Sequence, residues 1–234
     1  TRDAIDTRYE HEDGSIYNII DTAGIRRKRS IEDQSLERYS VLRSIAAIRR
    51  CNVAILIIDA QDGVTEQDMR IAGLIRDEGK AVILAVNKWD VIEKETGTLE
   101  AYRDQVLDRL KFINYAPVLF ISALTGQRVS QVWEMVSIVY AQAGRRIPTG
   151  ILNELIGEAQ MALQPPMEGG QRLKIYYATQ QGTYPPSFLL FVNNPQLIHF
   201  AYERYLENQM RKAFEFTGTP IRFYLRERDK EDIT

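Results

Sequence analysis

The 234-residue sequence is poor in cysteine and histidine and lacks any long apolar segment. Its single cysteine, Cys51, excludes a framework of disulfides within the chain, and the two histidines, His11 and His199, have no spacing typical of a metal site. No apolar run approaches the roughly 20 residues that a transmembrane helix needs. The polar start, TRDAIDTRYE, does not resemble a signal peptide. We therefore expect a cytoplasmic protein without a membrane span.

An excess of charge of either sign is also missing. Lys and Arg number 30 against 32 for Asp and Glu, which gives a net charge of −2. Overall charge therefore does not favour binding to nucleic acid or to a membrane, and any such surface must be local. The 44% of hydrophobic and 26% of charged residues are typical of a globular protein with one or two domains.

The first part of the chain alternates strand and helix patterns. Two runs with strand character, residues 4–9 and 16–21, are joined by a polar turn and predict a hairpin. Continuous apolar runs at residues 53–59, 81–87 and 117–122 are typical of parallel strands buried on both faces. Helical patterns occupy residues 35–49, 65–78, 99–110 and 129–143. This alternation predicts an α/β fold with a doubly wound sheet.

The pattern changes after residue 143. The segment GRRIPTG, residues 144–150, reads as a linker between a first domain (1–143) and a second domain (151–234). We predict a helix at 151–163, strands at 172–179 and 187–192, a helical stretch at 195–213 in two pieces, and a last strand at 220–226. The segment QPPMEGGQ reads as a loop. This order predicts a small α+β domain.

A motif of four residues follows the second apolar strand: Asn87, Lys88, Trp89 and Asp90. A carboxylate at Asp90 can accept both the N1–H and the 2-amino group of guanine, and adenine offers no such donor pair. Asn87 can bond the acceptor edge of the base, and the Lys88 stem can lie along one of its faces. The alternative is a strand end with a capped turn and no ligand.

Two further motifs follow strands in the order that a guanine-nucleotide site requires. Asp21 and Gly24 belong to D-T-A-G, in which the carboxylate can hold Mg²⁺ through water and the glycine N–H can approach a terminal phosphate. Ser122 and Ala123 follow the third apolar strand, where a backbone N–H can bond guanine O6. Thr1 can place its hydroxyl on the metal. Together these residues predict a site for GTP or GDP with Mg²⁺.

With these motifs the chain resembles the Era-like group of TRAFAC GTPases, and within it the Der (also called EngA) family of bacterial tandem GTPases. The stretches that carry the resemblance include DTAGIRRKRSIED, VNKWDVIEK, RLKIYYATQQGTYPPSFLLFVNNP and FAYERYLENQMRKAF. The resemblance covers nearly the whole chain. It implies the family's second GTPase domain, of the P-loop type, followed by its C-terminal KH-like domain.

The resemblance also implies a function. A Der-like protein is a GTPase that assembles the large (50S) ribosomal subunit, so the implied partners are this subunit, its rRNA and a first GTPase domain upstream in the same protein. The alternative that the residues leave open is a G-fold scaffold or nucleotide sensor, without enzymatic activity, in ribosome or RNA-protein assembly.

One element of the family is missing from the sequence. No G-x-x-x-x-G-K-[ST] phosphate loop is present, so we expect the sheet to be N-terminally incomplete and this chain alone to be inactive. No residue is a certain catalytic group. Ile25 follows Gly24, where many GTPases have a Gln that orients water. The resemblance implies that a potassium ion near the phosphates takes part instead.

The basic segment 26–29 and the second domain offer local surfaces. In the family, Gly24 and the residues that follow form the second switch, which reads either as a solvated loop or as a docking surface that responds to nucleotide. The second domain has no glycine at residues 194–202, where KH domains carry the RNA-clamping G-x-x-G loop. Tyr176, Tyr177 and Tyr184 can stack on bases, although core or interface roles are commoner for such residues. From residue 143 onward Lys and Arg number 11 and Asp and Glu number 10, so this domain has no basic excess.

Overall fold

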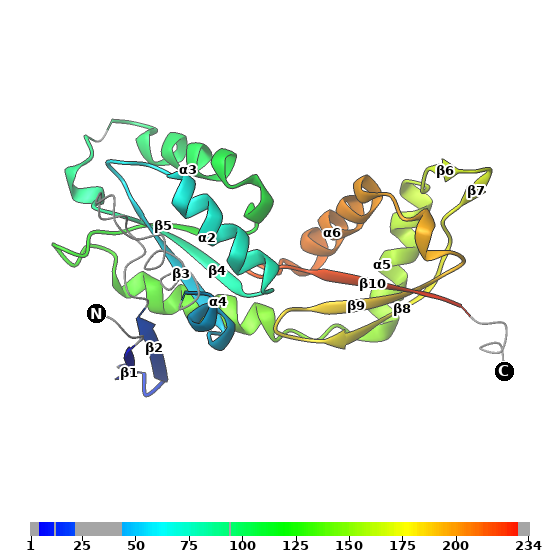
Figure 1. The fold of residues 1–234 in the computed structure, drawn as a ribbon, viewed down its shortest axis with the longest axis horizontal. Helices are drawn as coiled ribbons and strands as arrows, with labels where there is room; N and C mark the ends of the chain where they lie inside the picture. The colour runs from blue at the N-terminus through cyan, green and yellow to red at the C-terminus, as the bar shows by residue number, and fades with distance from the viewer. Residues whose placement is uncertain (1–4, 12, 22–43, 94, 229–234) are drawn as a thin grey trace, which may run out of the picture.

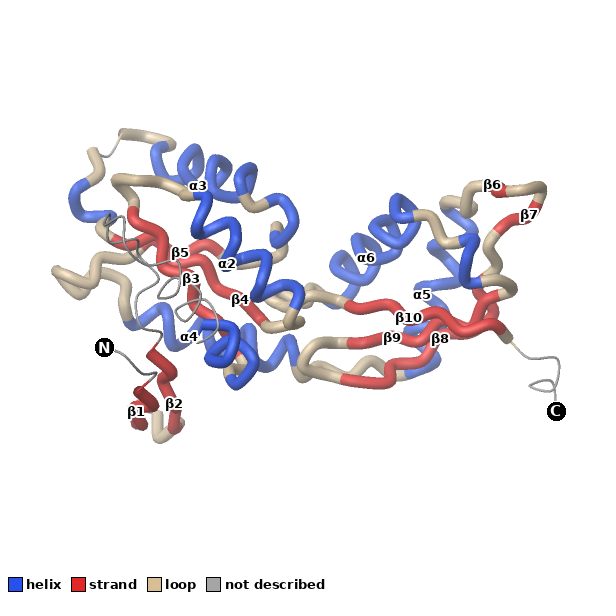
Figure 2. The backbone as a smooth tube through the Cα atoms, in the orientation of Figure 1, coloured by secondary structure: helices blue, strands red, loops and turns tan. Residues whose placement is uncertain are grey.

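The computed structural model describes residues 5–11, 13–21, 44–93 and 95–228. Two groups of elements, β1 to α4 and α5 to β10, follow one another along the long axis of the molecule (Figure 2). The first contains a parallel sheet in the order β3 (Val53–Asp59), β4 (Ala81–Asn87) and β5 (Val118–Phe120). The helices that alternate with these strands are α2 (Glu66–Asp77), α3 (Thr98–Arg109) and α4 (Ser130–Ala143). This is the α/β architecture predicted from the sequence (Figure 1).

The central strand β4 is buried on both faces, as its unbroken apolar run predicts. Val82, Leu84 and Val86 pack into the core shared with α2 and α3. The alternate residues pack against α4, and they are Ala81, Ile83 and Ala85. Each fully buried Val, Leu or Ile side chain contributes about 1.5–3 kcal/mol, so β4 holds the residues at its carboxyl end in a fixed place.

The edge strand β3 is buried on only one face within the described residues. Leu56 and Ile58 are buried in the core, whereas Ile55 and Ile57 are 38% and 52% exposed. The prediction of burial on both faces is therefore wrong for β3 as described, because Ile55 and Ile57 belong to none of the apolar clusters in which α2, α3 and α4 pack against the sheet.

The start of α2 shows how local sequence sets an element boundary. The hydroxyl of Thr65 accepts a hydrogen bond from the Asp68 N–H, and the Asp68 carboxylate accepts one from the Thr65 N–H at 2.9 Å. This reciprocal capping satisfies two donors that the first helical turn leaves without partners. The helix thus begins one residue after the predicted boundary.

The N-terminal hairpin forms as predicted. Strands β1 (Ile5–Glu10) and β2 (Ile16–Asp21) pair in antiparallel register as a separate two-stranded sheet. The Tyr9 ring stacks on Trp133 of α4 with centroids 4.6 Å apart. Of the helix predicted at 35–49, residues 44–50 are helical and the rest lies outside the described residues.

The second group of elements follows the predicted order. Helix α5 (Thr149–Ala162) is followed by β8 (Ile175–Gly182), β9 (Ser187–Val192), the short helix η3 (Pro195–Leu197), α6 (Phe200–Phe214) and β10 (Arg222–Glu227). The sheet order is β10-β9-β8, with β9 antiparallel to β8 and parallel to β10. Phe188, Leu190, Leu152 and Leu206 are fully buried between this sheet and the two long helices.

The segment predicted as a loop before β8 contains a small hairpin. Strands β6 (Met167–Glu168) and β7 (Gln171–Arg172) pair around Gly169 and Gly170, which both have positive φ, of 56° and 78°. Two such residues are what a tight two-residue hairpin turn requires. The strand predicted at 172–179 is therefore wrong in its first part, and the long strand begins at Ile175.

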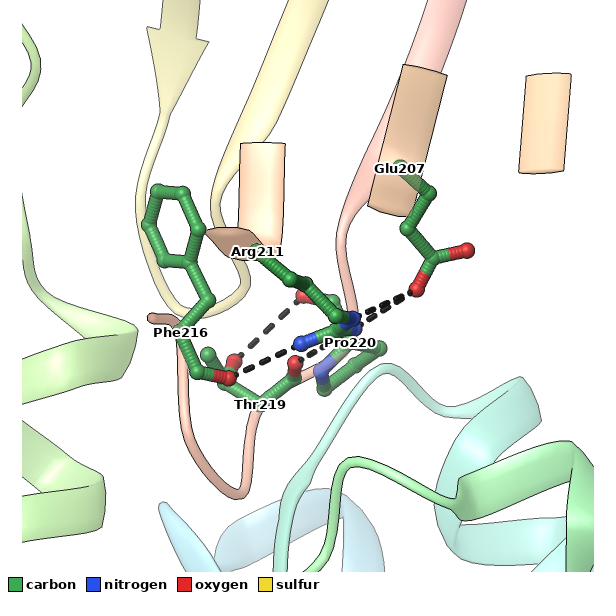
Figure 3. A network of polar contacts seen from close by, with 5 residues as sticks. All are labelled: Glu207, Arg211, Phe216, Thr219 and Pro220. Atoms are coloured by element: carbon green, nitrogen blue, oxygen red, sulfur yellow. Dashed lines mark hydrogen bonds and ion pairs between the residues drawn. The ribbon is translucent and has the colours of Figure 1, made fainter. Parts of the chain in front are cut away.

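Arg211 bonds two backbone carbonyls of the connection between α6 and β10. Arg211 Nη1 donates to the Phe216 carbonyl at 2.9 Å and Nη2 donates to the Thr219 carbonyl at 3.1 Å. The same guanidinium makes an ion pair with Glu207, 2.6 Å away (Figure 3). Its other neighbour is the Tyr115 ring, 4.4 Å from Arg211 Cζ, which belongs to the first group of elements.

Candidate guanine-nucleotide site

Three polar residues gather at the carboxyl edge of the parallel sheet. Asp59 is the last residue of β3, Asn87 is the last residue of β4, and Ser122 lies two residues after β5. Asp59 and Asn87 are direct partners in the parallel register. Ligands of open α/β sheets bind at this edge, so the strands bring the sequence-predicted residues to the expected place.

The turn after β4 is anchored by a buried tryptophan. Lys88 adopts a left-handed backbone conformation with φ of 62°, and Trp89 N–H then donates to the Ile121 carbonyl at 3.1 Å. The Trp89 side chain is 3% exposed, and its ring lies 4.4 Å from that of Phe120 and 5.3 Å from that of Tyr102. The indole is therefore part of the hydrophobic core, and it fixes the short helix η1 (Trp89–Val91), which contains Asp90.

Asn87 ties the loop after β5 to the end of β4. Its Oδ1 accepts the Ala123 N–H at 2.9 Å. Ser122 is fully buried, its N–H donates to the Gln127 carbonyl, and its hydroxyl accepts the Thr125 N–H at 3.2 Å. An O6 contact through Ala123 would therefore share that N–H with Asn87.

An ion pair that sequence reasoning missed lies beside these residues. Lys88 Nζ is 2.6 Å from Asp59 Oδ2, and the Asp59 side chain is only 6% exposed. Asp59 Oδ1 also accepts the Gln61 N–H at 3.0 Å. In the sequence, the sign of this pair is that the apolar run 53–59 ends in a polar residue. The contact itself depends on the register between β3 and β4.

Asp90 has an oxygen atom without a protein partner. Its Oδ1 is buried and forms no hydrogen bond within the described part of the chain. A buried carboxylate oxygen left unpaired costs about 1–3 kcal/mol or more, and such atoms are uncommon in native proteins. This position is therefore suited to a donor supplied by a ligand.

A small cavity of about 160 Å³ lies beside the same turn. Its lining residues are Trp89, Glu95, Thr98, Leu99, Gln127 and Arg128. Ligand pockets usually measure about 300–1,000 Å³, so this cavity is too small for a whole nucleotide.

Other predicted site residues lie at or beyond the limits of the described chain. Asp21 ends β2 opposite Ile5, and only its backbone position is described. Thr1, Gly24 and Ile25 lie outside the described residues, as does the basic segment 26–29. Within the described ranges, no three His, Cys, Asp or Glu side chains are grouped to hold a metal.

The same ranges contain no helix that is both long enough and apolar enough to cross a bilayer.

Comparisons with known proteins match both parts of the chain. Residues 1–142 match the model of the elongation factor Tu GTP-binding domain. Residues 146–226 match the model of the KH-domain-like C-terminal domain of EngA bacterial GTPases.

Curated relatives named GTPase Der match almost the entire chain. Those of Acetivibrio thermocellus and Ruminiclostridium cellulolyticum are each 57% identical over 99% of this chain and 52% of their own length. The chain thus spans about half the length of the curated relatives it matches.

Solved structures of Era have a similar fold. Aquifex aeolicus Era bound to GDP.AlF4− has a TM-score of 0.51 at 19% identity and covers 97% of this chain and 81% of its own. An Era complex with MgGDPNP and a segment of 16S ribosomal RNA has a TM-score of 0.50 at 19% identity, over 99% of this chain and 83% of its own. At this identity the likeness shows the fold alone. The two family models and the Der relatives show more: this chain belongs to the Der (EngA) family of GTPases.

Proposed function

We propose that this chain is the guanine-nucleotide-binding and KH-like part of a GTPase that assembles the large (50S) ribosomal subunit. The observation that carries the nucleotide part is the buried, unpaired Oδ1 of Asp90. It lies in the turn that follows β4, next to the Asn87 contact with Ala123. We place the boundary between the two domains at residues 144–150.

Guanine would complete the hydrogen bonding of Asp90. The N1–H and the 2-amino group of guanine are parallel donors, and a carboxylate accepts both. Adenine presents no such pair, so a bound adenine would leave the carboxylate unpaired. Asn87 and Lys88 would complete the base site, with Ser122 and Ala123 on the neighbouring loop.

Hydrolysis belongs to the complete protein in this proposal. Asp21 would hold the metal through a water molecule, the Gly24 N–H would contact the terminal phosphate, and the Thr1 hydroxyl would bind Mg²⁺. When bound, Mg²⁺ neutralises charge on the phosphates, and a potassium ion would supply further positive charge. The assignment to the large subunit and its rRNA, and to an upstream GTPase domain as a partner, rests on the family resemblance.

Exchange of one side chain in the complete protein tests the base contact. Xanthine carries a carbonyl where guanine has its 2-amino group, so an amide at position 90 suits xanthine better. We expect Asp90→Asn to weaken GTP binding at least about 100-fold and to strengthen binding of xanthosine triphosphate. Asp62→Asn makes the same chemical change at an exposed position of the same sheet edge and should leave both affinities unchanged. Titration calorimetry measures both, and unaltered GTP affinity in Asp90→Asn would refute the assignment.

A further inference from the structure

Among the described residues, the sheet of the second group of elements has one face that no helix covers. Helices α5 and α6 lie on the same side of β8, β9 and β10 (Figure 1). On that side Phe188, Leu190 and Val192 of β9 are fully buried. The alternate residues Leu189 and Phe191 point to the opposite side, where they are only partly buried.

Aromatic rings are concentrated on this opposite face. A register shift in β8 between Ile175 and Tyr177 leaves Tyr176 as an extra residue beside the pair Tyr177–Phe191, which brings two neighbouring tyrosines to this part of the sheet. The two tyrosines are 43% and 45% exposed, and Tyr224 of β10, the register partner of Leu189, is 43% exposed. The Tyr177 and Phe191 ring centroids are 5.8 Å apart.

Cations accompany these rings. Arg228 Cζ lies 5.1 Å and Lys174 Nζ lies 5.6 Å from the Tyr176 ring centroid. Arg226 Cζ lies 6.0 Å from that of Phe191. The local charge is therefore positive, although the domain as a whole has no basic excess.

Acidic side chains are absent from the outward positions of the three strands as described. These positions are occupied by Tyr177, Thr179, Ser187, Leu189, Phe191, Arg222, Tyr224 and Arg226. Glu227 is the register partner of Val192 and so alternates to the side of the buried residues.

The RNA-clamping loop of ordinary KH domains has no counterpart here. Between β9 and α6, side chains already occupy the backbone N–H groups at the helix starts. Asn194 Oδ1 accepts the Gln196 N–H at 2.9 Å, and His199 Nδ1 accepts the Ala201 N–H at 3.2 Å. Tyr184 is also unsuited to base stacking, because its ring packs against Tyr140 with centroids 4.9 Å apart.

We propose that the uncovered sheet face, defined by Tyr176, Tyr177, Phe191, Tyr224, Arg226, Arg228 and Lys174, binds single-stranded RNA. Flat exposed rings stack on bases whatever the sequence, and neighbouring cations attract the phosphates. The cations and the absence of carboxylates among the described outward residues favour an anionic partner over an apolar one, and the exposed rings favour nucleic acid over an acidic protein surface because bases stack on them. The hydroxyls of Tyr177, Tyr224 and Thr179 can bond ribose 2′-OH groups, which favours RNA over DNA. This surface goes beyond the nucleotide site and does not depend on it.

Fluorescence anisotropy with the complete protein and labelled, unstructured 12-nucleotide RNA tests the proposal without GTP, Mg²⁺ or ribosomes. We expect Tyr177→Ala and Tyr224→Ala each to weaken binding about tenfold. Tyr177→Phe should retain most of the affinity because the ring remains. Phe200→Ala, which removes an aromatic ring that is 73% exposed on α6, should bind as the parent does.

The salt dependence separates phosphate contacts from stacking. Arg226→Gln with Arg228→Gln should lower the slope of log affinity against log salt by about 1.4, which corresponds to two single-strand phosphate contacts. The tyrosine variants should leave the slope unchanged. The same sequence as DNA should bind more weakly than RNA.

Three results would overturn the inference. They are full RNA affinity in the double variant Tyr177→Ala with Tyr224→Ala, equal loss of affinity in Phe200→Ala, and a tyrosine effect on protein self-association without one on RNA binding. Circular dichroism and urea unfolding establish that each variant is folded. A failure here would leave the Asp90 assignment intact, because the two experiments share neither ligand nor residues.

Discussion

The Val82 N–H donates to the Gly218 carbonyl across 2.7 Å, and the Gly218 N–H donates to the Tyr115 carbonyl across 2.8 Å. This pair of hydrogen bonds joins the α6–β10 connection to the amino ends of β4 and β5. Arg222 adds a third contact by donating from Nη2 to the Asp77 carbonyl at 2.8 Å. The KH-like part is therefore held at the end of the parallel sheet opposite the candidate nucleotide site.

Gly218 occupies a place that no larger residue fits. Its φ is +71°, and an added Cβ would lie 2.5 Å from Val139 Cγ2. We expect Gly218→Ala to lower the free energy of unfolding by about 2–4 kcal/mol, because strain and overpacking add. Gly126→Ala is the matched control: its φ is +76° but no atom lies within 4 Å of the added Cβ. Urea unfolding should show a loss of only about 1 kcal/mol there, and equal losses at both positions would argue against the close contact.

The planar guanidinium of Arg211 bonds three groups at once. A lysine keeps the charge, but its donors share one nitrogen and cannot span Glu207, Phe216 and Thr219, which bond three separate nitrogens of Arg211. We expect Arg211→Lys to lower the free energy of unfolding by about 2–3 kcal/mol. Arg204→Lys, at an exposed position of the same helix, should change it by less than about 0.5 kcal/mol. A similar small change for Arg211→Lys would show that charge alone suffices.

The ion pair between Asp59 and Lys88 can be measured by a double-mutant cycle. The Asp59 carboxylate is nearly buried while Lys88 is 46% exposed, so solvent partly screens the pair. We expect Asp59→Asn and Lys88→Met to be coupled by about 1 kcal/mol in urea unfolding. Additive effects of the two substitutions would mean that the pair contributes nothing to stability.

The pH dependence of stability should show the effect of the partly buried Glu203 carboxyl. Burial, together with the Glu207 charge, raises the pKa of the Glu203 carboxyl. A raised pKa means that the folded state favours the protonated form, so stability from this group is present at low pH and is lost as pH rises through the folded pKa. Glu203→Gln should therefore be more stable than the parent at pH 7, and this advantage should shrink as pH falls toward 4. Thermal unfolding across this pH range checks the prediction, and an advantage that does not vary with pH would contradict it.

Much of the fold follows from local sequence. The apolar runs define β3 and β4 to the residue, because strands whose ends are polar have clear boundaries. The position of the turn that carries Lys88 and Asp90 was equally predictable, since it follows such a run at the carboxyl edge of a parallel sheet. Its role as a base site stays a prediction. The helical pattern at 65–78 placed the start of α2 within one residue of Glu66.

Contacts between distant segments were decided only by the tertiary structure. The Asp59–Lys88 pair needs the parallel register, and the grouping of Tyr176 with Tyr177 needs a bulge that no pattern in one strand specifies. Gly218 reads in the sequence as an ordinary turn glycine, and only the packing of Val139 against it makes it irreplaceable. Local sequence sets each residue's preferred backbone and the face it presents, whereas these contacts depend on how separate elements pack, which is a property of the whole chain.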